Sequence, residues 1–116
     1  MIRIFSAFSS SNKPKIRGSK WRALRQEVIA QTPYCEICGS TKNLEVHHFY
    51  DVSHFPHLEL QDQNLIVLCD GSEHYKGLSC HRIFGHLGDW KKTNYNLRSQ
   101  LPTLRDLLFK KPKRRN

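Results

Sequence analysis

Apolar residues recur at helical spacing between residues 19 and 31. The residues on the shared face are Trp21, Leu24, Val28 and Ile29. A serine can cap the N-terminus of a helix, so the helix is expected to start at Ser19. It should end at about Gln31, because Thr32 precedes a proline and such residues avoid the helical region of backbone space. The pattern predicts one amphipathic helix over residues 19–31.

Two apolar runs in the middle of the chain have a different character. NLEVHHFY, residues 43–50, is rich in β-branched and aromatic residues and predicts a strand. NLIVLC, residues 64–69, is almost uniformly apolar and fits either a strand or a helix, which periodicity cannot separate. A loop that contains Pro56 should connect the two runs over residues 51–63.

The C-terminal half predicts two more helical segments. CHRIFGHLGDW, residues 80–90, should begin as a helix that Gly85 or Gly88 ends, and Trp90 is expected in the core rather than as a platform for stacking a base. The last amphipathic helix has Pro102 near its start, and its apolar residues are Leu101, Leu104, Leu107 and Leu108. Together these elements predict a small α+β domain over residues 19–95, preceded by an arm at 1–18 and followed by a helix and tail at 96–116.

The length and the distribution of charge narrow the classes of function. A chain of 116 residues suits one small domain, and no apolar run is long enough to cross a membrane. The net charge of +9 is concentrated at the two ends, since residues 1–26 carry seven basic side chains and no acid. Residues 90–116 carry nine basic residues against Asp106 alone, whereas residues 27–89 are acidic overall. Basic arms around a histidine- and cysteine-rich centre favour binding to nucleic acid.

Four cysteines are better explained as metal ligands than as two disulfides, because the N-terminus does not resemble a secretory signal. Cys35 and Cys38 form a C-x-x-C turn of the kind that supplies two thiolates to zinc. Cys69 and Cys80 would complete the site, with residues 70–79 as a loop between them. The alternatives are that the second pair is formed by buried free thiols while the first pair is a redox motif, or that His74 or His81 replaces one of the cysteines.

The order of the histidines adds a family resemblance. CEIC, LEVHH, NLIVLC and CHRIFGHLGDW, taken together, resemble the HNH endonucleases, and residues 46–70 look especially like phage-encoded members. The resemblance covers about residues 19–95. It implies a ββα-metal core stapled by a zinc knuckle, and DNA cleavage with one divalent ion. It also implies a role in phage genome packaging, with a terminase as partner, and a location in the host cell cytoplasm.

His47 and His48 are adjacent, so on a strand their side chains point to opposite faces. A nitrogen bound to a metal cannot also accept a proton, and neighbouring residues allow the two tasks to be divided. By similarity to the family, His47 is a metal ligand and His48 is the general base. Asn64 holds the loop or the base in register, and His81 is the second metal ligand.

His86 is the candidate for a third metal ligand. Many relatives place a second histidine four residues after the first, but here Gly85 stands at that position. Five positions along an ideal helix rotate by ~140°, which would point His86 away from His81. Either the helix bulges or ends at Gly85 and brings His86 back, or His86 contacts DNA instead.

The remaining expectations concern DNA contacts, ions and competing functions. The residues expected at DNA phosphates are Arg22, Arg25, Arg82, Lys91 and Lys92.

The expected ions are a structural Zn²⁺ and a catalytic Mg²⁺ or Mn²⁺, for which Ni²⁺ or Zn²⁺ can substitute at imidazole ligands. The competing functions are a non-catalytic, zinc-stabilised DNA-binding module and, with less support, a nuclease that acts on RNA.

Overall fold

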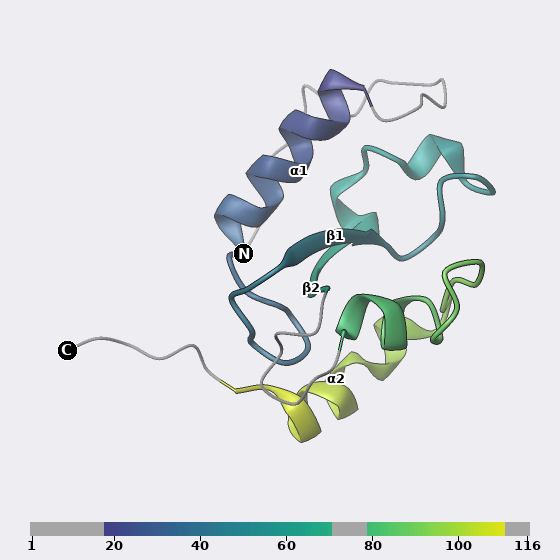
Figure 1. The fold of residues 1–116 in the computed structure, drawn as a ribbon. Helices are drawn as coiled ribbons and strands as arrows, with labels where there is room; N and C mark the ends of the chain where they lie inside the picture. The colour runs from purple at the N-terminus through teal and green to yellow at the C-terminus, as the bar shows by residue number, and fades with distance from the viewer. Residues whose placement is uncertain (1–17, 71–78, 111–116) are drawn as a thin grey trace.

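A two-stranded antiparallel sheet separates two helical layers (Figure 1). The computed structural model describes residues 18–70 and 79–110. Its main elements are α1 (Ser19–Gln31), β1 (Leu44–His48), β2 (Leu65–Cys69), the π-helical turn η4 (His81–Gly85) and α2 (Leu97–Leu108). Two short 3-10 turns, η2 (Pro56–Leu58) and η3 (Asp62–Asn64), lie in the connection between the strands. The predicted α+β single domain is confirmed at this level.

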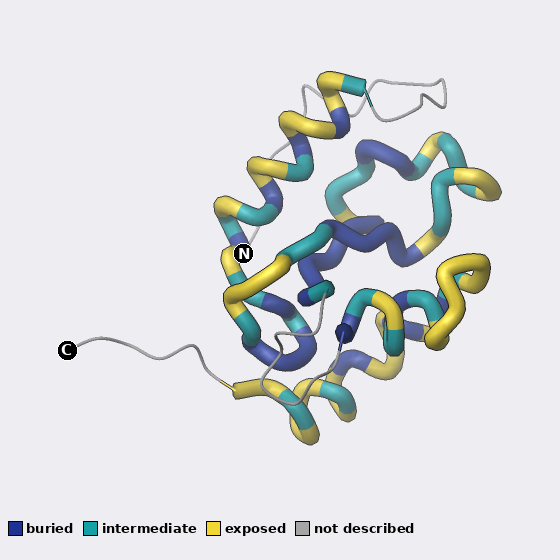
Figure 2. The backbone as a smooth tube through the Cα atoms, viewed as in Figure 1, coloured by how far each residue is buried: buried dark blue, intermediate teal, exposed yellow. Residues whose placement is uncertain are grey.

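Each face of the sheet packs against a different layer, because side chains alternate along a strand. Val46, Leu65 and Val67 pack against the buried face of α1. Ile66 and Leu68 belong to a second cluster, which includes the four cysteines and the first turns of α2. Figure 2 shows the resulting band of buried chain through both strands.

The strand register places the two histidines at the end of β1. His47 lies opposite Ile66 and His48 lies opposite Leu65, at the start of β2. Phe49 donates its backbone N–H to the carbonyl of Asn64 at 2.8 Å, which continues the pairing by one residue. His47 and His48 are thus held by the sheet on one side and by the loop between the strands on the other.

The predicted elements are found, with two corrections at their ends. The first helix covers residues 19–31 as expected, but Gly18 is its N-cap and no side chain caps it. The prediction that Pro102 lies near the start of the last helix was wrong, because α2 begins at Leu97 and Pro102 is inside it. The ambiguous run at residues 65–69 is a strand, since it pairs with β1 along its whole length.

Several sequence-based expectations fall outside the described residues. These are the N-terminal arm up to residue 17, the loop at residues 71–78 with His74, and the basic tail at residues 111–116. Among the helices of the described part, none is long and apolar enough to cross a membrane.

Candidate functional site

The four cysteines form one buried cluster, which we call the four-cysteine cluster (Cys35, Cys38, Cys69 and Cys80). All four are at most 2% exposed, and their sulfur atoms lie within 4.8 Å of one another. The Sγ atoms of Cys38 and Cys69 are 3.7 Å apart, too far for a disulfide. Two sulfurs on a tetrahedral zinc ion, each bonded at about 2.3 Å, are roughly 3.8 Å apart. The cluster therefore has the donors and the spacing to hold a zinc ion.

The turn that carries the first two cysteines is fixed to the sheet. Glu36 donates its backbone N–H to the carbonyl of Val67 at 2.8 Å, and its carboxylate accepts the N–H of Val67 at 2.8 Å. The N–H groups of Ile37 and Cys38 point at Cys35 Sγ, at 3.4 and 3.5 Å. These bonds place Cys35 and Cys38 beside Cys69 at the end of β2.

The ionisation of the cysteines also favours a bound cation. Hydrogen bonds from Cys38, then from Cys69 and Cys80, lower the pKa of Cys35 and so favour its thiolate form. Hydrogen bonding to Cys35 and the other two sulfurs, together with burial, raises the pKa of Cys80. Four buried thiolates repel one another unless a cation neutralises them. The prediction that Cys69 and Cys80 join the first pair is confirmed, and His81 lies in a different cluster.

Three histidines from two elements form a second group, the three-histidine cluster (His47, His81 and His86). One nitrogen from each lies within 4.8 Å of the others. The Nε2 atoms of His81 and His86 are 3.2 Å apart, close to the roughly 3.3 Å expected for two imidazoles on one tetrahedral ion. The ring of His47 is 5.1 Å from that of His81 and 4.9 Å from that of His86, between ring centres.

The backbone of η4 explains how His86 reaches His81. Residues 81–85 form a π-helical turn, which is wider than an α-helical turn, so His86 returns to the side of His81. The bulged helix, one of the two geometries expected from the sequence, is the one observed. Gly85 is needed here for a steric reason, since a Cβ at this position would lie 3.0 Å from Cε1 of His47.

The surroundings of the three rings direct nitrogen lone pairs toward a common point. His86 donates its Nδ1–H to the carbonyl of Lys92 at 2.7 Å, which leaves the lone pair on Nε2. His81 Nδ1 is 3.5 Å from the carboxylate of Asp70, an electrostatic contact that favours the same tautomer. His47 Nε2 is buried and has no hydrogen-bond partner among the residues that the structure describes. A divalent ion of the kind that imidazole prefers would satisfy all three nitrogens.

Burial keeps two of these rings in the neutral form that a metal requires. Burial, together with the charges of His81 and His86, lowers the pKa of His47 to about 2. Burial and then the charge of His86 lower the pKa of His81, although Asp70 acts in the opposite direction. Both rings are thus available as neutral ligands at neutral pH.

His48 lies on the other face of β1, against α1. Its ring stacks on Trp21 with 4.7 Å between ring centres. Its Nε2–H donates to the carbonyl of Glu59 at 2.9 Å, which places the lone pair on Nδ1. The structure therefore separates His48 from the three-histidine cluster, as alternation along a strand requires.

The two faces nevertheless meet in one cavity of about 320 Å³. His47, His48, His81 and His86 all line it, together with Trp21 and Arg25 of α1 and with Asp51, Trp90 and other residues at its rim. A single ligand in this cavity can touch His48 and a metal ion at the three-histidine cluster at the same time.

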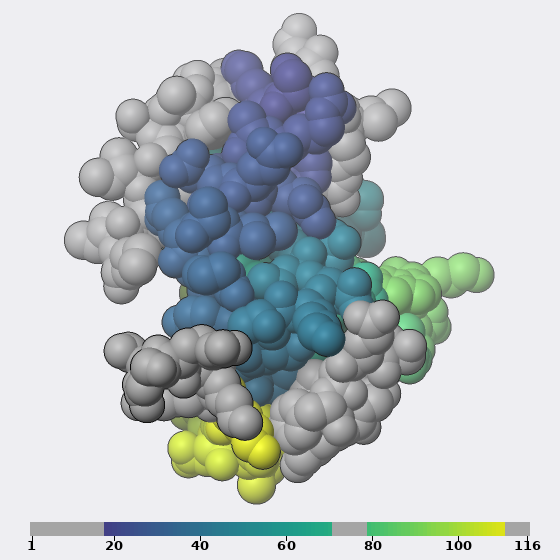
Figure 3. Space-filling model, turned by 60° about the vertical axis from the view of Figure 1, so that its left-hand side comes forward, coloured from purple at the N-terminus to yellow at the C-terminus, as the bar shows by residue number. Residues whose placement is uncertain are grey.

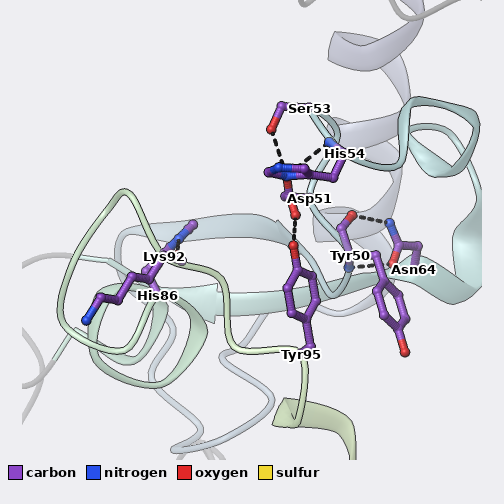
Figure 4. A network of polar contacts seen from close by, with 8 residues as sticks. All are labelled: Tyr50, Asp51, Ser53, His54, Asn64, His86, Lys92 and Tyr95. Carbon is purple, nitrogen blue, oxygen red and sulfur yellow. Dashed lines mark hydrogen bonds and ion pairs between the residues drawn. The ribbon is translucent and has the colours of Figure 1, made fainter.

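Asn64 is buried and acts through the loop between the strands. Its Oδ1 accepts the N–H of Tyr50 at 2.8 Å, and its Nδ2 donates to the carbonyl of the same residue (Figure 4). The Nδ2 also donates to the carbonyl of Leu58 at 3.3 Å. Leu58 directly precedes Glu59, whose carbonyl accepts the hydrogen bond from His48. Asn64 thus fixes the segment that orients His48.

The basic residues expected at DNA fall into two groups. Arg25 lines the cavity and pairs with Glu45 at 3.0 Å. Four are exposed at the surface: Arg22, Arg82, Lys91 and Lys92. The expectation that Trp90 is a core residue was wrong, because 53% of it is exposed.

The sequence interpretation missed four residues that support the histidines. Trp21 and Glu59 contact His48, and Asp70 faces His81. Asp51 lines the cavity and accepts the hydroxyl of Tyr95 (Figure 4). Burial works in the opposite direction, but hydrogen bonds from Tyr95, Ser53 and His54 lower the pKa of Asp51. Of these four residues, only Asp70 could have been proposed from the sequence, because it is an acidic residue directly after Cys69.

Comparisons with models of protein families, with curated proteins and with solved structures found no match for this chain.

Proposed function

We propose that this protein is a metal-dependent DNA endonuclease of the HNH type, with a ββα-metal core. The observation that carries the proposal is the division of the adjacent histidines. His47 joins His81 and His86 on one face of β1, and His48 faces α1, yet all four line one cavity. Hydrolysis of a phosphodiester needs both a cation and a separate base at one phosphate.

In this proposal His48 takes a proton from the attacking water through Nδ1. The bond from His48 Nε2 to the carbonyl of Glu59 selects that tautomer, and stacking on Trp21 fixes the plane of the ring. The water oxygen bonds to phosphorus as its proton passes to His48, the bond from phosphorus to one ester oxygen breaks, and that oxygen takes up a proton from solvent. The products are a phosphate end and a hydroxyl end on the cut strand.

The three-histidine cluster is the proposed holder of the divalent ion. Such an ion supplies positive charge to the phosphate and to the leaving oxygen. Mg²⁺ and Mn²⁺ are the ions proposed for catalysis in the cell. Three imidazoles also suit Ni²⁺ and Zn²⁺, so these ions belong in any test.

The basic residues would bind the substrate away from the reacting atoms. Arg82 follows His81 directly and is exposed, so its guanidinium fits the phosphate of the cut strand or the next one. Arg22, Lys91 and Lys92 would bind other phosphates without regard to sequence. The resemblance to phage members adds the proposed setting, which is genome packaging with a terminase as partner.

One observation favours a second candidate, a non-catalytic DNA-binding module. The four-cysteine cluster and the exposed basic residues would serve such a module equally well. The three-histidine cluster favours the endonuclease over the binding module, because a protein that only binds DNA does not need a second group of metal ligands.

The test is cleavage of supercoiled plasmid by the zinc-loaded chain with added Mg²⁺, Mn²⁺, Ni²⁺ or Zn²⁺, or with no added ion. The proposal expects relaxed or linear products only with an added ion, and loss of cleavage in His81→Ala with DNA binding retained. DNA binding without cleavage under any ion would favour the non-catalytic module. A parallel assay on RNA of the same sequence tests the preference for DNA.

A further inference from the structure

The turn that follows η4, residues 86–92, places two exposed apolar side chains at the edge of the three-histidine cluster. Leu87 is 54% exposed and Trp90 is 53% exposed. The ring of Trp90 is 5.1 Å from that of His81 and 5.0 Å from that of His86, between ring centres. Figure 3 shows this green part of the chain projecting beyond the body of the molecule.

The backbone holds this turn in a defined conformation. Leu87 has a φ of 57° and Gly88 a φ of 79°, so a leucine occupies a left-handed conformation that side chains disfavour. Gly88 donates its N–H to the carbonyl of Arg82 at 2.8 Å, and Asp89 donates to that of His86 at 2.9 Å. His86 Nδ1 closes the turn by donating to the carbonyl of Lys92. The same hydrogen bond that orients His86 therefore also fixes the turn.

The charged residues near Leu87 and Trp90 indicate which kind of partner these two side chains would bind. Lys91 and Lys92 follow Trp90 directly and are exposed, and Arg82, whose carbonyl accepts the N–H of Gly88 in this turn, is also exposed. The one acid in the turn, Asp89, has its carboxylate engaged by the N–H of Lys91 at 3.0 Å. A half-exposed indole in a turn that also carries exposed cations matches a nucleic acid strand, which offers phosphates to the cations and base faces to the ring.

We infer that Trp90 stacks on an unpaired base of the DNA next to the phosphate to be cut, and that Leu87 packs beside that base. A perfect duplex offers base faces only where the stack is broken. The preferred substrate would then be DNA with unpaired bases at the cut site. This inference rests on the proposed function for its choice of DNA, and it adds the substrate class.

Tryptophan fluorescence tests the contact without cleavage. The chain has two tryptophans, and Trp21 is only 7% exposed, so quenching by neutral acrylamide reports mainly on Trp90. The full zinc-loaded chain is saturated, without added divalent ion, with a duplex that contains a small bubble, with the same duplex fully paired, or with polyphosphate. Polyphosphate engages the cations but has no bases.

The bubble should protect Trp90 from acrylamide, and polyphosphate should leave it accessible. Trp90→Ala should weaken binding to the bubble by about five- to a hundredfold, as expected for the loss of one stacked base, and should weaken duplex binding less. Trp90→Phe should keep most of the affinity, and Leu107→Ala should bind as the native chain does, since Leu107 is 70% exposed on α2.

Two results would overturn the inference. One is a bubble complex in which Trp90 is as accessible as in the polyphosphate complex. The other is a folded Trp90→Ala variant that binds the bubble as tightly as the native chain. Cleavage without protection of Trp90 would reject the stacking but leave the proposed nuclease function standing. Protection of Trp90 without cleavage would support the stacking and contradict the nuclease function.

Discussion

The rings of His47 and His48 belong to neighbouring residues of β1 and yet contact different layers of the molecule. His47 lies against Gly85 of η4, and His48 stacks on Trp21 of α1. The period of two along a strand makes this separation unavoidable once β1 is paired with β2. At this end of β1, the rings of His47 and His48 nevertheless line the same cavity.

Gly85→Ala should disturb the three-histidine cluster. A Cβ at this position would lie 3.0 to 3.2 Å from three atoms of the His47 ring, so either that ring or η4 must move. We expect a loss of about 1–3 kcal/mol of stability and a weaker affinity for Ni²⁺ by tenfold or more. Titration calorimetry on the zinc-loaded chain measures the affinity.

Gly88→Ala is the matched control for this substitution. Nothing lies within 4 Å of a Cβ there, but its φ of 79° makes any side chain strained. It should lower the free energy of unfolding by about 1 kcal/mol and leave the affinity for Ni²⁺ unchanged. Equal loss of affinity in both variants would contradict the contact with His47.

Asn64→Ala should slow cleavage without removing the metal ion. The substitution breaks three partly buried hydrogen bonds, two to Tyr50 and one to Leu58 in the segment before Glu59, and hence disturbs the orientation of His48. We expect a lower kcat, an unchanged affinity for Ni²⁺, and a loss of about 1–3 kcal/mol of stability. Single-turnover cleavage at saturating enzyme separates kcat from binding. A normal kcat in the folded variant would contradict the positioning role.

The buried His47 should make stability fall in mild acid. Its pKa drops from 6.5 to about 2 on folding because of burial and the charges of His81 and His86. Below pH 6.5 the unfolded chain therefore binds a proton that the folded chain does not. Stability should decrease as the pH falls from 6.5 toward 2, by at most about 1.4 kcal/mol per pH unit.

Urea unfolding of the native chain and of His47→Gln, at about pH 7 and about pH 5, isolates this contribution. The native chain should lose more stability than the variant between the two pH values. The comparison is needed because loss of zinc from the four-cysteine cluster in acid affects both chains alike. Parallel pH profiles would show that His47 is protonated in the folded protein.

The first strand, the first helix and the meeting of four cysteines could be predicted from the sequence, because each depends on local pattern or on ligand chemistry. The run at 65–69 became a strand only through its pairing with β1, a long-range contact that periodicity cannot show. The place of His86 depends on the π-helical turn of η4, and a choice between helix types is not visible in residue spacing.

Other parts of the site depend on tertiary contacts that local sequence does not encode. The carbonyl of Glu59 reaches His48 only because Asn64 holds the loop, and Trp21 meets His48 only because α1 packs on the sheet. Trp90 was expected in the core because large apolar residues are usually buried there. Its position in an exposed turn beside the three-histidine cluster is what led to the inferred base contact.

The most direct test of the central claim is cleavage of supercoiled plasmid by His48→Ala, compared with the native chain and with His57→Ala. His57 is an exposed histidine in the same loop region and serves as the control. All three chains should first show the same zinc content and the same affinity for Ni²⁺. The account predicts that His48→Ala cuts about 10²- to 10⁴-fold more slowly, while His57→Ala cuts at the native rate. Equal rates for His48→Ala and the native chain would contradict the division of roles between His47 and His48.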